Sequence, residues 1–385
     1  MSSSTPPLHV GCTFESGNIE VVRCENPSDV ELQIRKDVGE DHFQWFHFRA
    51  TGTRDRELVF RITNAGQASY PDGWKDYRVC VSYGQEEAWT RLPADYDGNV
   101  LSFRCRPDVD LVHFAYFAPY PSRRHQALLG YAIDEPSVRY ERLGATVDGR
   151  DLDLLHVTDR EGSRDGRLQC WIIGRQHPGE SMAEWLMEGL IEHLLDPDEP
   201  TSRALLKRCA FHLVPNMNPD GSFRGHLRNN AAGQNLNRAW AEPSLERSPE
   251  VFLVRRAMER TGVDFFLDVH GDEALPYNFI AGADGIPSWS PAHGVRQASY
   301  KELLQTINPD FQTKHGYPVA KPGKANLSMA TNWVAERFKC LAMTLEQPFK
   351  DTADTPHPDG WSPERAKKLG RDQLLTLYAM LDRLR

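Results

Sequence analysis

Two side chains able to bind a metal lie close together in the chain. His177 and Glu180 are three residues apart, in a turn that also contains Pro178 and Gly179. Both side chains can therefore point at one ion. His270, 93 residues further on, would complete a set of two histidines and one glutamate, which hydrolytic zinc sites commonly use while leaving one position for water. We predict that His177, Glu180 and His270 bind zinc.

Glu346 is the candidate general base. A bound metal lowers the pKa of its water towards ~7 and polarises a carbonyl group. A carboxylate must then accept the water proton and deliver it to the leaving amine. Glu346 directly follows the apolar run of residues 340–345. The alternatives are a solvated glutamate at a strand end and, for His270, a hydrogen-bonded turn residue.

An irregular segment supplies groups that bind carboxylates. Residues 218–228 and 233–238 are rich in amide and guanidinium side chains and follow an apolar run. The planar fork of arginine suits a carboxylate, and asparagine can add a further contact. An arginine close to the metal could also stabilise an oxyanion. The alternative is an ordinary polar surface loop.

Apolar runs with the length of buried strands precede these candidate residues. Such runs occupy residues 168–173, 210–214, 264–269 and 340–345. Ligands of open α/β sheets bind at the carboxyl ends of the strands. The predicted metal ligands and Glu346 should therefore meet at one edge of a sheet.

Helical patterns alternate with these strands. Residues 182–194 place their apolar side chains on one helix face. Ser248-Pro-Glu250 and Ser362-Pro-Glu364 have the sequence of helix starts, and Gly262 is the expected end of the first of these two helices. Alternation of strands and helices predicts an α/β layer fold for the larger part of the chain.

The first ~120 residues instead alternate apolar and polar side chains between turn residues, which predicts short strands and a β-sandwich. The expected strands are residues 44–49, 58–63, 77–83, 100–105 and 111–117. Pro119-Tyr-Pro-Ser122 ends this region, and a helix is expected to begin at Arg123. We therefore predict an N-terminal domain of residues 1–122 and a catalytic domain of residues 123–385.

Composition excludes several other classes of protein. A net charge of -9 argues against a nucleic-acid-binding surface. No run of 18 apolar residues occurs, and the start lacks a cationic leader before an apolar run, so neither a membrane span nor a signal peptide is expected. The seven cysteines are scattered and odd in number. They indicate reduced thiols in a cytoplasmic protein.

The chain resembles the zinc metallocarboxypeptidases of the carboxypeptidase A type, and more closely their cytosolic carboxypeptidase branch. The resemblance covers roughly residues 125 to 385 and rests on His177-Pro-Gly-Glu180, Asn218-Pro-Asp-Gly221, Asn235-Leu-Asn-Arg238, Asp268-Val-His270 and Thr344-Leu-Glu346. The N-terminal segment is similar to the β-sandwich of that branch at Ser16-Gly-Asn-Ile19, Gln44-Trp-Phe46, Ile62-Thr-Asn64 and Phe117-Ala-Pro-Tyr120.

The resemblance implies a role for each site residue. Zinc would be bound by the two histidines and the glutamate already named, and Glu346 would be the general base and later the acid. Asn237 and Arg238 would hold the terminal carboxylate of a peptide or protein substrate, and Arg228 would polarise the scissile carbonyl. The implied fold is a mixed, eight-stranded type of sheet sandwiched by helices, in agreement with the alternation above.

Five residues concern a departure from the family, the capping of substrate or the specificity. Asn235 stands where the family often has an aspartate that orients a zinc-binding histidine, and a neutral amide should raise imidazole basicity less. Tyr317 is the candidate for the tyrosine that caps bound substrate. Some members of the branch trim glutamates from acidic tails, for which a basic pocket is expected. Its candidate residues are Lys321, Lys324 and Arg337, and the alternative is that they are ordinary solvated side chains.

Two other functions are compatible with the same residues. A zinc deacylase of small N-acyl amino acids would share the histidine–glutamate motif and an arginine, but would have no reason for the N-terminal sandwich. A non-catalytic binding protein could use the sandwich for recognition and retain the zinc site as a relic. The presence of Glu346 argues against a relic, because such a protein needs no base.

Overall fold

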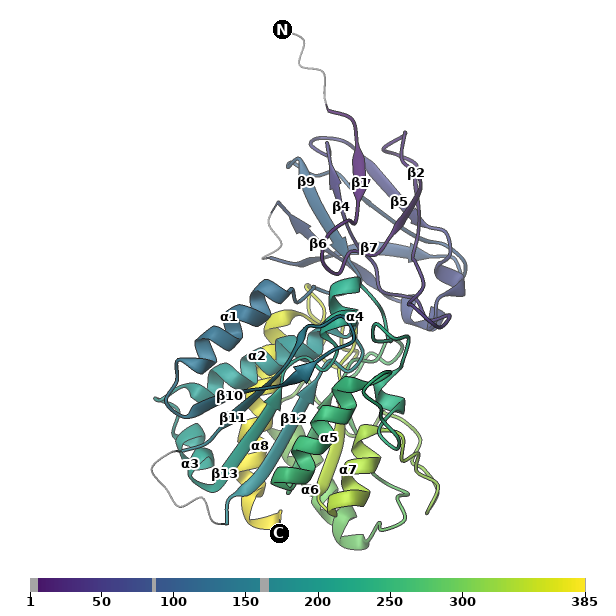
Figure 1. Ribbon diagram of the computed structural model, residues 1–385. Coiled ribbons are helices and arrows are strands. Elements are labelled where there is room, and N and C mark those ends of the chain that lie inside the picture. The colour runs from purple at the N-terminus through teal and green to yellow at the C-terminus, as the bar shows by residue number, and fades with distance from the viewer. Residues whose placement is uncertain (1–5, 85–87, 160–165, 385) are drawn as a thin grey trace.

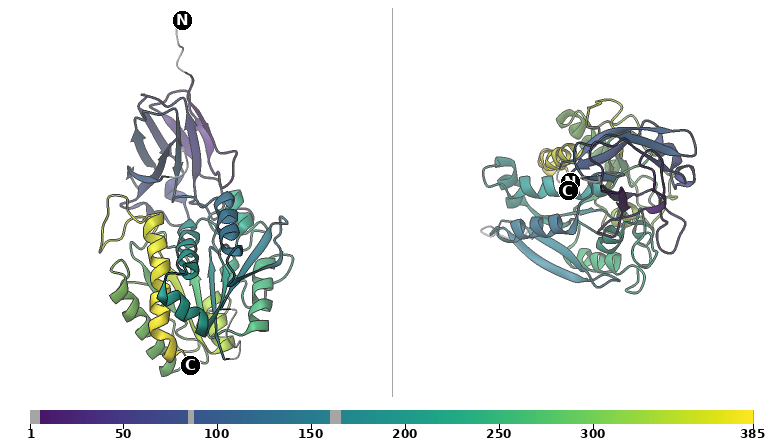
Figure 2. Two further views of the ribbon diagram at one scale, coloured as in Figure 1. Left: turned by 90° about the vertical axis from the view of Figure 1, so that its left-hand side faces the viewer. Right: turned by 90° about the horizontal axis from the view of Figure 1, so that it is seen from above.

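The computed structural model describes residues 6–84, 88–159 and 166–384. An all-β part is formed by the first third of the chain, and a layered α/β part by the remainder (Figure 1). The two parts are stacked end to end along the long axis of the molecule (Figure 2). Within the described ranges, none of the helices has the length and apolar character of a bilayer-spanning segment.

The N-terminal part is built on nine described strands joined in the order β1-β4-β9-β6-β7-β8-β5-β3-β2. All neighbours are antiparallel except β3 and β5, which are parallel. The strands are β1 (His9–Gly11), β2 (Glu20–Arg23), β3 (Val30–Gln33), β4 (His47–Thr51), β5 (Leu58–Ile62), β6 (Arg78–Tyr83), β7 (Thr90–Tyr96), β8 (Leu101–Cys105) and β9 (Leu111–Ala115).

This sheet folds over on itself to make a sandwich. Strands β9 and β5 are four positions apart in the sheet, yet the rings of Phe114 and Phe60 are only 4.9 Å apart. Phe48 on β4 likewise lies 5.3 Å from Phe60. Alternate side chains of each strand therefore meet in one aromatic core, as the period-2 pattern of the sequence predicts. The predicted N-terminal β-sandwich is confirmed.

The α/β part contains a mixed sheet in the order β10-β11-β13-β12-β14-β16-β15. The four predicted apolar runs are its central, parallel strands, and β10, β11 and β15 pair antiparallel at the edges. The described residues contribute seven strands, one fewer than the eight-stranded type expected. The strands are β10 (Val138–Ala145), β11 (Asp151–Val157), β12 (Leu168–Gly174), β13 (Cys209–Val214), β14 (Phe265–Val269), β15 (Phe279–Gly282) and β16 (Leu341–Glu346).

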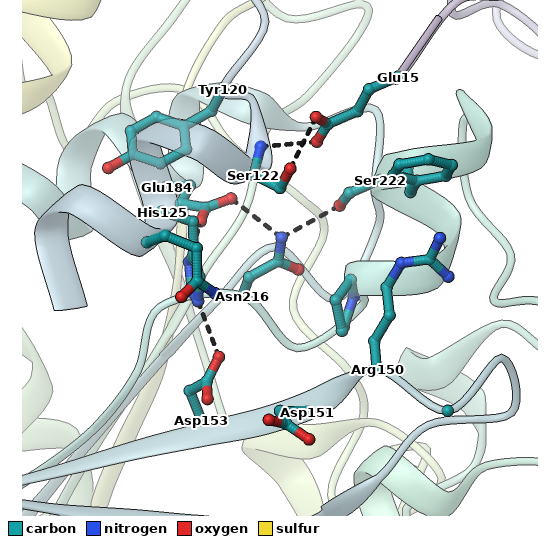
Figure 3. A pocket seen from close by; sticks show the side chains of 14 residues that line it. Glu15, Tyr120, Ser122, His125, Arg150, Asp151, Asp153, Glu184, Asn216 and Ser222 are labelled. Atoms are coloured by element: carbon teal, nitrogen blue, oxygen red, sulfur yellow. Dashed lines mark hydrogen bonds and ion pairs between the residues drawn. The ribbon is translucent and has the colours of Figure 1, made fainter. Parts of the chain in front are cut away.

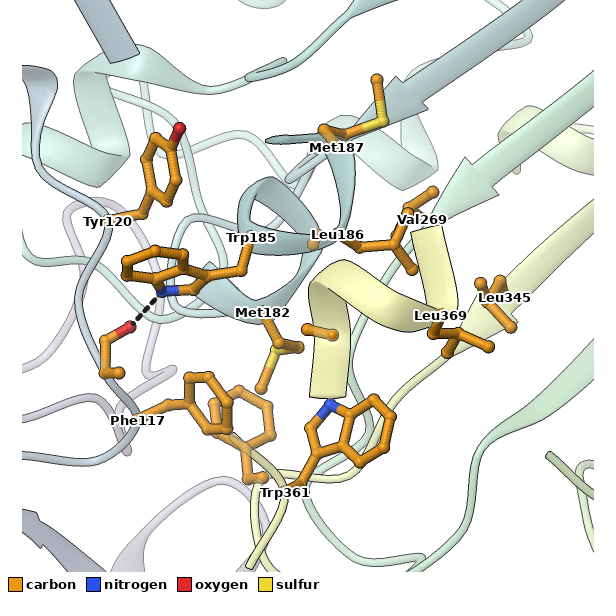
Figure 4. Packing of buried hydrophobic residues seen from close by; sticks show 14 of the residues in the cluster. Phe117, Tyr120, Met182, Trp185, Leu186, Met187, Val269, Leu345, Trp361 and Leu369 are labelled. Carbon is orange, nitrogen blue, oxygen red and sulfur yellow. Dashed lines mark hydrogen bonds between the residues drawn. The ribbon is translucent and has the colours of Figure 1, made fainter. Parts of the chain in front are cut away.

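Helices cover both faces of this sheet. On β12, Ile172 belongs to the core shared with α2 and α8, whereas Ile173 belongs to the core shared with α5 and α7. In Figure 4, Met182 and Leu186 of α2 lie beside Leu369 of α8 and the strand ends. The helices are α1 (Ser122–Ile133), α2 (Ser181–Leu195), α3 (Pro200–Arg208), α4 (Pro219–Arg224), α5 (Pro249–Thr261), α6 (Pro291–Ile307), α7 (Ala330–Phe338) and α8 (Pro363–Met380). The predicted α/β fold with a helix-covered mixed sheet is confirmed.

Candidate active site

The three predicted metal ligands meet in the structure. Ligand atoms of His177, Glu180 and His270 all lie within 4.8 Å of one another, and all three side chains are buried. The Nδ1 atom of His177 is 2.6 Å from Glu180 Oε1, and that of His270 is 2.8 Å from Glu180 Oε2. Two imidazoles and one carboxylate facing a common point form the donor set that zinc takes in hydrolytic sites.

The turn between β12 and α2 brings the first two ligands together. The strand ends at Gly174, and the helix begins one residue after Glu180, which is its N-cap. Gly179 donates its backbone N–H to Leu227 O at 2.9 Å. A Cβ atom at Gly179 would lie 3.0–3.1 Å from backbone atoms of Leu227. Only glycine allows this close approach without displacing one of the two segments.

Charge in the cluster suits a cation. Burial, followed by the nearby Arg228, lowers the pKa of His177 to about 3. Burial raises the pKa of Glu180, but His177 and His270 outweigh it and leave that pKa lowered. Burial lowers the pKa of His270, but Asp268 and Glu180 outweigh it and leave that pKa raised. A neutral His177 and an ionised Glu180 are the protonation states that ligate metals, and His270 would release its proton when a cation binds. The three donor groups present therefore fit zinc.

Each imidazole is oriented by a second partner on its far nitrogen. His270 Nε2 lies 2.9 Å from Asp268 Oδ2, and His177 Nε2 lies 3.1 Å from Asn235 Oδ1. Such partners fix the ring orientation and tune ligand basicity. Asn235 therefore stands at the position inferred for it, with an amide in place of a carboxylate. Asp268 supplies a carboxylate to His270, a role that was not predicted from the sequence.

Glu346 lies at the carboxyl end of β16, beside the end of β14. Burial raises its pKa to about 8, opposed by His270. The Tyr317 hydroxyl shares its one proton between Asp272 Oδ2, at 2.6 Å, and Glu346 Oε1, at 3.1 Å. The Oε2 atom of Glu346 is buried and has no hydrogen-bond partner among the described residues. One carboxylate oxygen is thus available to a group bound in the site, and Tyr317 lies at that same site.

The two predicted arginines and the asparagine lie together near the cluster. Asn237 Nδ2 is 3.5 Å from His270 Nε2, and its Oδ1 accepts from Ala330 N at 2.9 Å. Arg238 donates to Asn237 O at 2.7 Å. Burial, followed by the neighbouring charge of Arg228, lowers the pKa of Arg238. Neither arginine forms an ion pair within the described ranges, so two adjacent cations face the site without a protein carboxylate bound to them.

The candidate residues of the basic pocket lie on helix α7 and in the segment that precedes it. Arg337, near the carboxyl end of α7, lies 3.7 Å from Glu259 of α5, and its guanidinium is over the Phe338 ring. Arg337 therefore lies about two turns along α7 from Ala330, the residue whose N–H binds Asn237. Lys321 and Lys324 lie on an exposed turn, in the same connecting segment as Tyr317.

A buried polar network contacts the metal turn, the segment between β12 and α2 that carries His177 and Glu180. Arg175 has a left-handed φ of 59°, and its guanidinium donates to Pro178 O at 3.0 Å and to Glu184 Oε2 at 2.6 Å. Glu184 also contacts His125, which is bonded on its other nitrogen to Asp153. Glu184, His125 and Asp153 also line a separate cavity of about 430 Å³ (Figure 3). Their charges hold the strained residue that precedes the metal ligands.

Comparison with known proteins places the chain in a family. Residues 125–366 match the zinc carboxypeptidase family, and residues 10–117 match the cytosolic carboxypeptidase N-terminal domain. An uncharacterized protein of Zymomonas mobilis is 47% identical over 378 residues, which are 98% of this chain and 97% of that protein. Cytosolic carboxypeptidase 6 of Mus musculus is 30% identical over 300 residues, 70% of this chain and 54% of that protein. The chain thus spans about half the length of the mouse relative.

Two solved structures match this chain over nearly its whole length. The metallo-carboxypeptidase of Pseudomonas aeruginosa, in complex with (2-guanidinoethylmercapto)succinic acid, is 47% identical with a TM-score of 0.94 and covers 98% of this chain and 100% of its own. The metallo-carboxypeptidase of Burkholderia cenocepacia is 42% identical with a TM-score of 0.95, covering 97% and 99%. The chain therefore belongs to the zinc carboxypeptidase family and carries the N-terminal domain of its cytosolic branch.

Proposed function

We propose that the chain is a zinc-dependent carboxypeptidase that removes the C-terminal residue from peptides or protein tails. One zinc ion would be held by His177, Glu180 and His270. The observation that carries this proposal is the convergence of these three buried ligands beside Glu346, at one end of the sheet. Zinc supplies a polarised carbonyl and a water of lowered pKa when it is bound.

The protein groups around that cluster suit the ends of a peptide. Asn237 and Arg238 would hold the terminal carboxylate, because neither side chain is bound to a carboxylate of the described residues, and amide and guanidinium N–H groups donate hydrogen bonds to one. Arg228 would donate to the oxygen of the scissile carbonyl as negative charge develops there. Holding the chain end and the reacting carbonyl at once fixes the bond to be cleaved, which makes the reaction an exopeptidase reaction.

Glu346 would move the proton. Its Oε2 atom, which has no partner among the described residues, would accept a proton from the attacking water. The same carboxyl group would then protonate the leaving amine. Tyr317, hydrogen-bonded to the other oxygen at 3.1 Å, holds the carboxyl in one orientation. Tyr317 would also close over the bound substrate, as the position of its exposed ring at the site allows.

We propose a preference for acidic C-terminal residues as the finer specificity. It is supported by Lys321 and Lys324, the two exposed lysines of the segment that follows Tyr317, and by the family branch to which the chain belongs. Glutamate at the chain end would place its side-chain carboxylate near these cations. Replacing both lysines by glutamine should lower kcat/KM for glutamate-ended peptides more than for leucine-ended ones.

A peptide library tests the function directly. The zinc-loaded protein is incubated with peptides that differ only in their C-terminal residue, and the products are read by mass spectrometry. We expect loss of single C-terminal residues that a chelator stops and added zinc restores. A deacylase would instead cleave short N-acyl amino acids and lose turnover as the peptide lengthens. Absence of cleavage of either substrate would refute the proposal.

The cellular setting and the domain division are parts of the same proposal. All seven cysteines are free in the structure, which suits the reducing cytoplasm. We propose a division into residues 1–122 and 123–385, since the last strand of the sandwich ends at Ala115 and α1 begins at Ser122. Residues 1–5 and 385 lie outside the described residues.

A further inference from the structure

A carboxylate from the N-terminal sandwich reaches the segment that carries Arg228. Asp37 follows strand β3, and 5% of it is exposed. Its two oxygens accept three backbone N–H bonds, from Leu227 at 2.7 Å, Arg228 at 2.7 Å and Asn229 at 2.9 Å. Three consecutive residues of the segment 223–238, called here the arginine loop, are thus bound by one side chain.

The buried carboxylate of Asp37 and the three backbone N–H groups depend on each other as hydrogen-bond partners. Burial raises the pKa of the Asp37 carboxyl, and His226 and the three amide donors act in the opposite direction. A buried carboxylate loses its hydration and needs hydrogen-bond partners in return. The three N–H groups also need an acceptor, because an unpaired buried donor costs free energy. Asp37 and the arginine loop therefore satisfy each other, and neither can move alone.

Two more contacts hold the loop from the same side. Asn18 Nδ2 donates to Gly225 O at 2.9 Å, and Ser16 N donates to Phe223 O at 2.8 Å. Gly225 has a φ of 72°, and a Cβ there would lie 2.6 Å from Ser16 O. The N-terminal part therefore touches the loop before Arg228 as well as at it. A loop bound at successive backbone atoms has little freedom to reorient.

The head of Arg228 also meets the N-terminal part. Its Cζ atom lies 6.0 Å from the centroid of the Tyr70 ring, within the range of a cation–π contact. Tyr70 immediately precedes the short 3-10 helix Pro71–Trp74 of the sandwich. Backbone and head of the arginine are thus both held by residues outside the α/β part.

The loop in turn touches the metal turn. Leu227, whose N–H binds Asp37, accepts the backbone N–H of Gly179 on its carbonyl oxygen at 2.9 Å. Gly179 lies between the ligands His177 and Glu180. Hydrogen bonds therefore link the sandwich, through the arginine loop, to the turn that carries two of the predicted zinc ligands.

We propose that the N-terminal domain is part of the catalytic apparatus, with Asp37 as a positioning residue that fixes the backbone of residues 227–229 so that Arg228 meets the scissile carbonyl. Tyr70 assists by holding the guanidinium. The inference rests on the proposed function, because it assigns Asp37 to the transition-state contact of Arg228. On this proposal the sandwich takes part in catalysis, in addition to any part that it has in the stability of the fold.

A double-mutant cycle on the zinc-loaded full chain tests the inference. The chains compared are the wild type, Asp37→Asn, Arg228→Ala and the double variant. Asp37→Asn keeps the size of the side chain but replaces one acceptor oxygen by a donor, so part of the loop is released. We expect kcat to fall by about 10–100-fold, because a misplaced oxyanion contact loses most of its effect. KM should change far less than kcat, since the contact strengthens only in the transition state.

The cycle separates positioning from general destabilisation. If Asp37 acts through Arg228, Asp37→Asn should lower kcat little further once Arg228 is alanine. A matched control is Asp41→Asn, a carboxylate four residues away in the same segment that is exposed and paired with Lys36, which should leave kcat unchanged. Zinc content and circular dichroism of every variant are measured in parallel.

The outcomes are distinct. An unchanged kcat in Asp37→Asn would overturn the inference, and so would losses in the two single variants that multiply in the double variant. In either case an active wild type leaves the proposed function standing. An inactive wild type would instead refute the proposed function. If Asp37→Asn does not fold, Tyr70→Leu replaces it in the cycle. It should lower kcat severalfold in the wild type and little in Arg228→Ala, and an equal loss in both backgrounds would overturn the inference.

Discussion

Replacement of His125 by glutamine should remove a pH-dependent part of the stability. His125 lies between Asp153 Oδ2 at 2.9 Å and Glu184 Oε1 at 2.6 Å, and 9% of the residue is exposed. Burial lowers its pKa, but the two carboxylates outweigh burial and raise the pKa to about 9 from the ordinary 6.5. Glutamine keeps hydrogen-bonding groups at the position but carries no charge in the titration range.

The size of the effect follows from the two pKa values. The folded state binds the proton more tightly than the unfolded state, so the histidine stabilises the fold fully below about pH 6.5. The contribution then falls as pH rises through about 9. At about 1.36 kcal/mol per unit, a difference of about 2.5 units corresponds to about 3 kcal/mol. The stability lost in His125→Gln should therefore be about 3 kcal/mol greater at pH 6 than above pH 9.5.

Urea unfolding at several pH values measures this difference. Transitions followed by fluorescence and by circular dichroism should coincide, which justifies a two-state free energy. His357→Gln is the control, because that histidine is exposed and 3.7 Å from Asp359 at the surface, and its effect should not vary by this amount. A stability difference for His125→Gln that stays constant from pH 6 to above pH 9.5 would refute the reasoning.

Three further predictions concern the site. His177→Ala should lose the metal, and full zinc occupancy by metal analysis would remove His177 from the ligand set. Asn235→Asp should tighten zinc binding by about tenfold, because a carboxylate raises imidazole basicity more than an amide does; competition with a chelator measures it, and an unchanged or weaker affinity contradicts it. Arg238→Ala should raise KM for peptides by about tenfold or more with a smaller effect on kcat. A normal KM in that variant would exclude Arg238 as the anchor of the chain end.

The sequence predicts the centre of the α/β fold better than its edges. The four apolar runs became the central strands β12, β13, β14 and β16, because strands buried on both faces need apolar side chains throughout. Edge strand β10 was not identified, since most of its side chains are partly or fully exposed and their polar residues hide the period. Helix α6 was missed for a related reason. Two of its four buried residues are His293 and Gln297, so no apolar stripe marks the face.

The candidate site likewise contains residues that could be predicted from the sequence and one that could not. His177 and Glu180 share one turn, and Glu346 ends the strand next to the one that His270 follows. Local spacing and the expected strands were therefore sufficient to predict that these residues meet. Asp37 could not be found from the sequence. It lies 190 residues from Leu227, and a single aspartate after a strand has no local feature that identifies its partner.

The central claim is that Glu346 moves protons for a zinc ion bound by separate residues. Glu346→Gln in the zinc-loaded chain tests it most directly, with metal content and peptide turnover measured on one preparation. Zinc content should equal that of the wild type, because Glu346 is not a ligand, while kcat should fall by about 10²–10⁴-fold. Wild-type turnover in this variant, or loss of the zinc together with activity, would contradict the assignment.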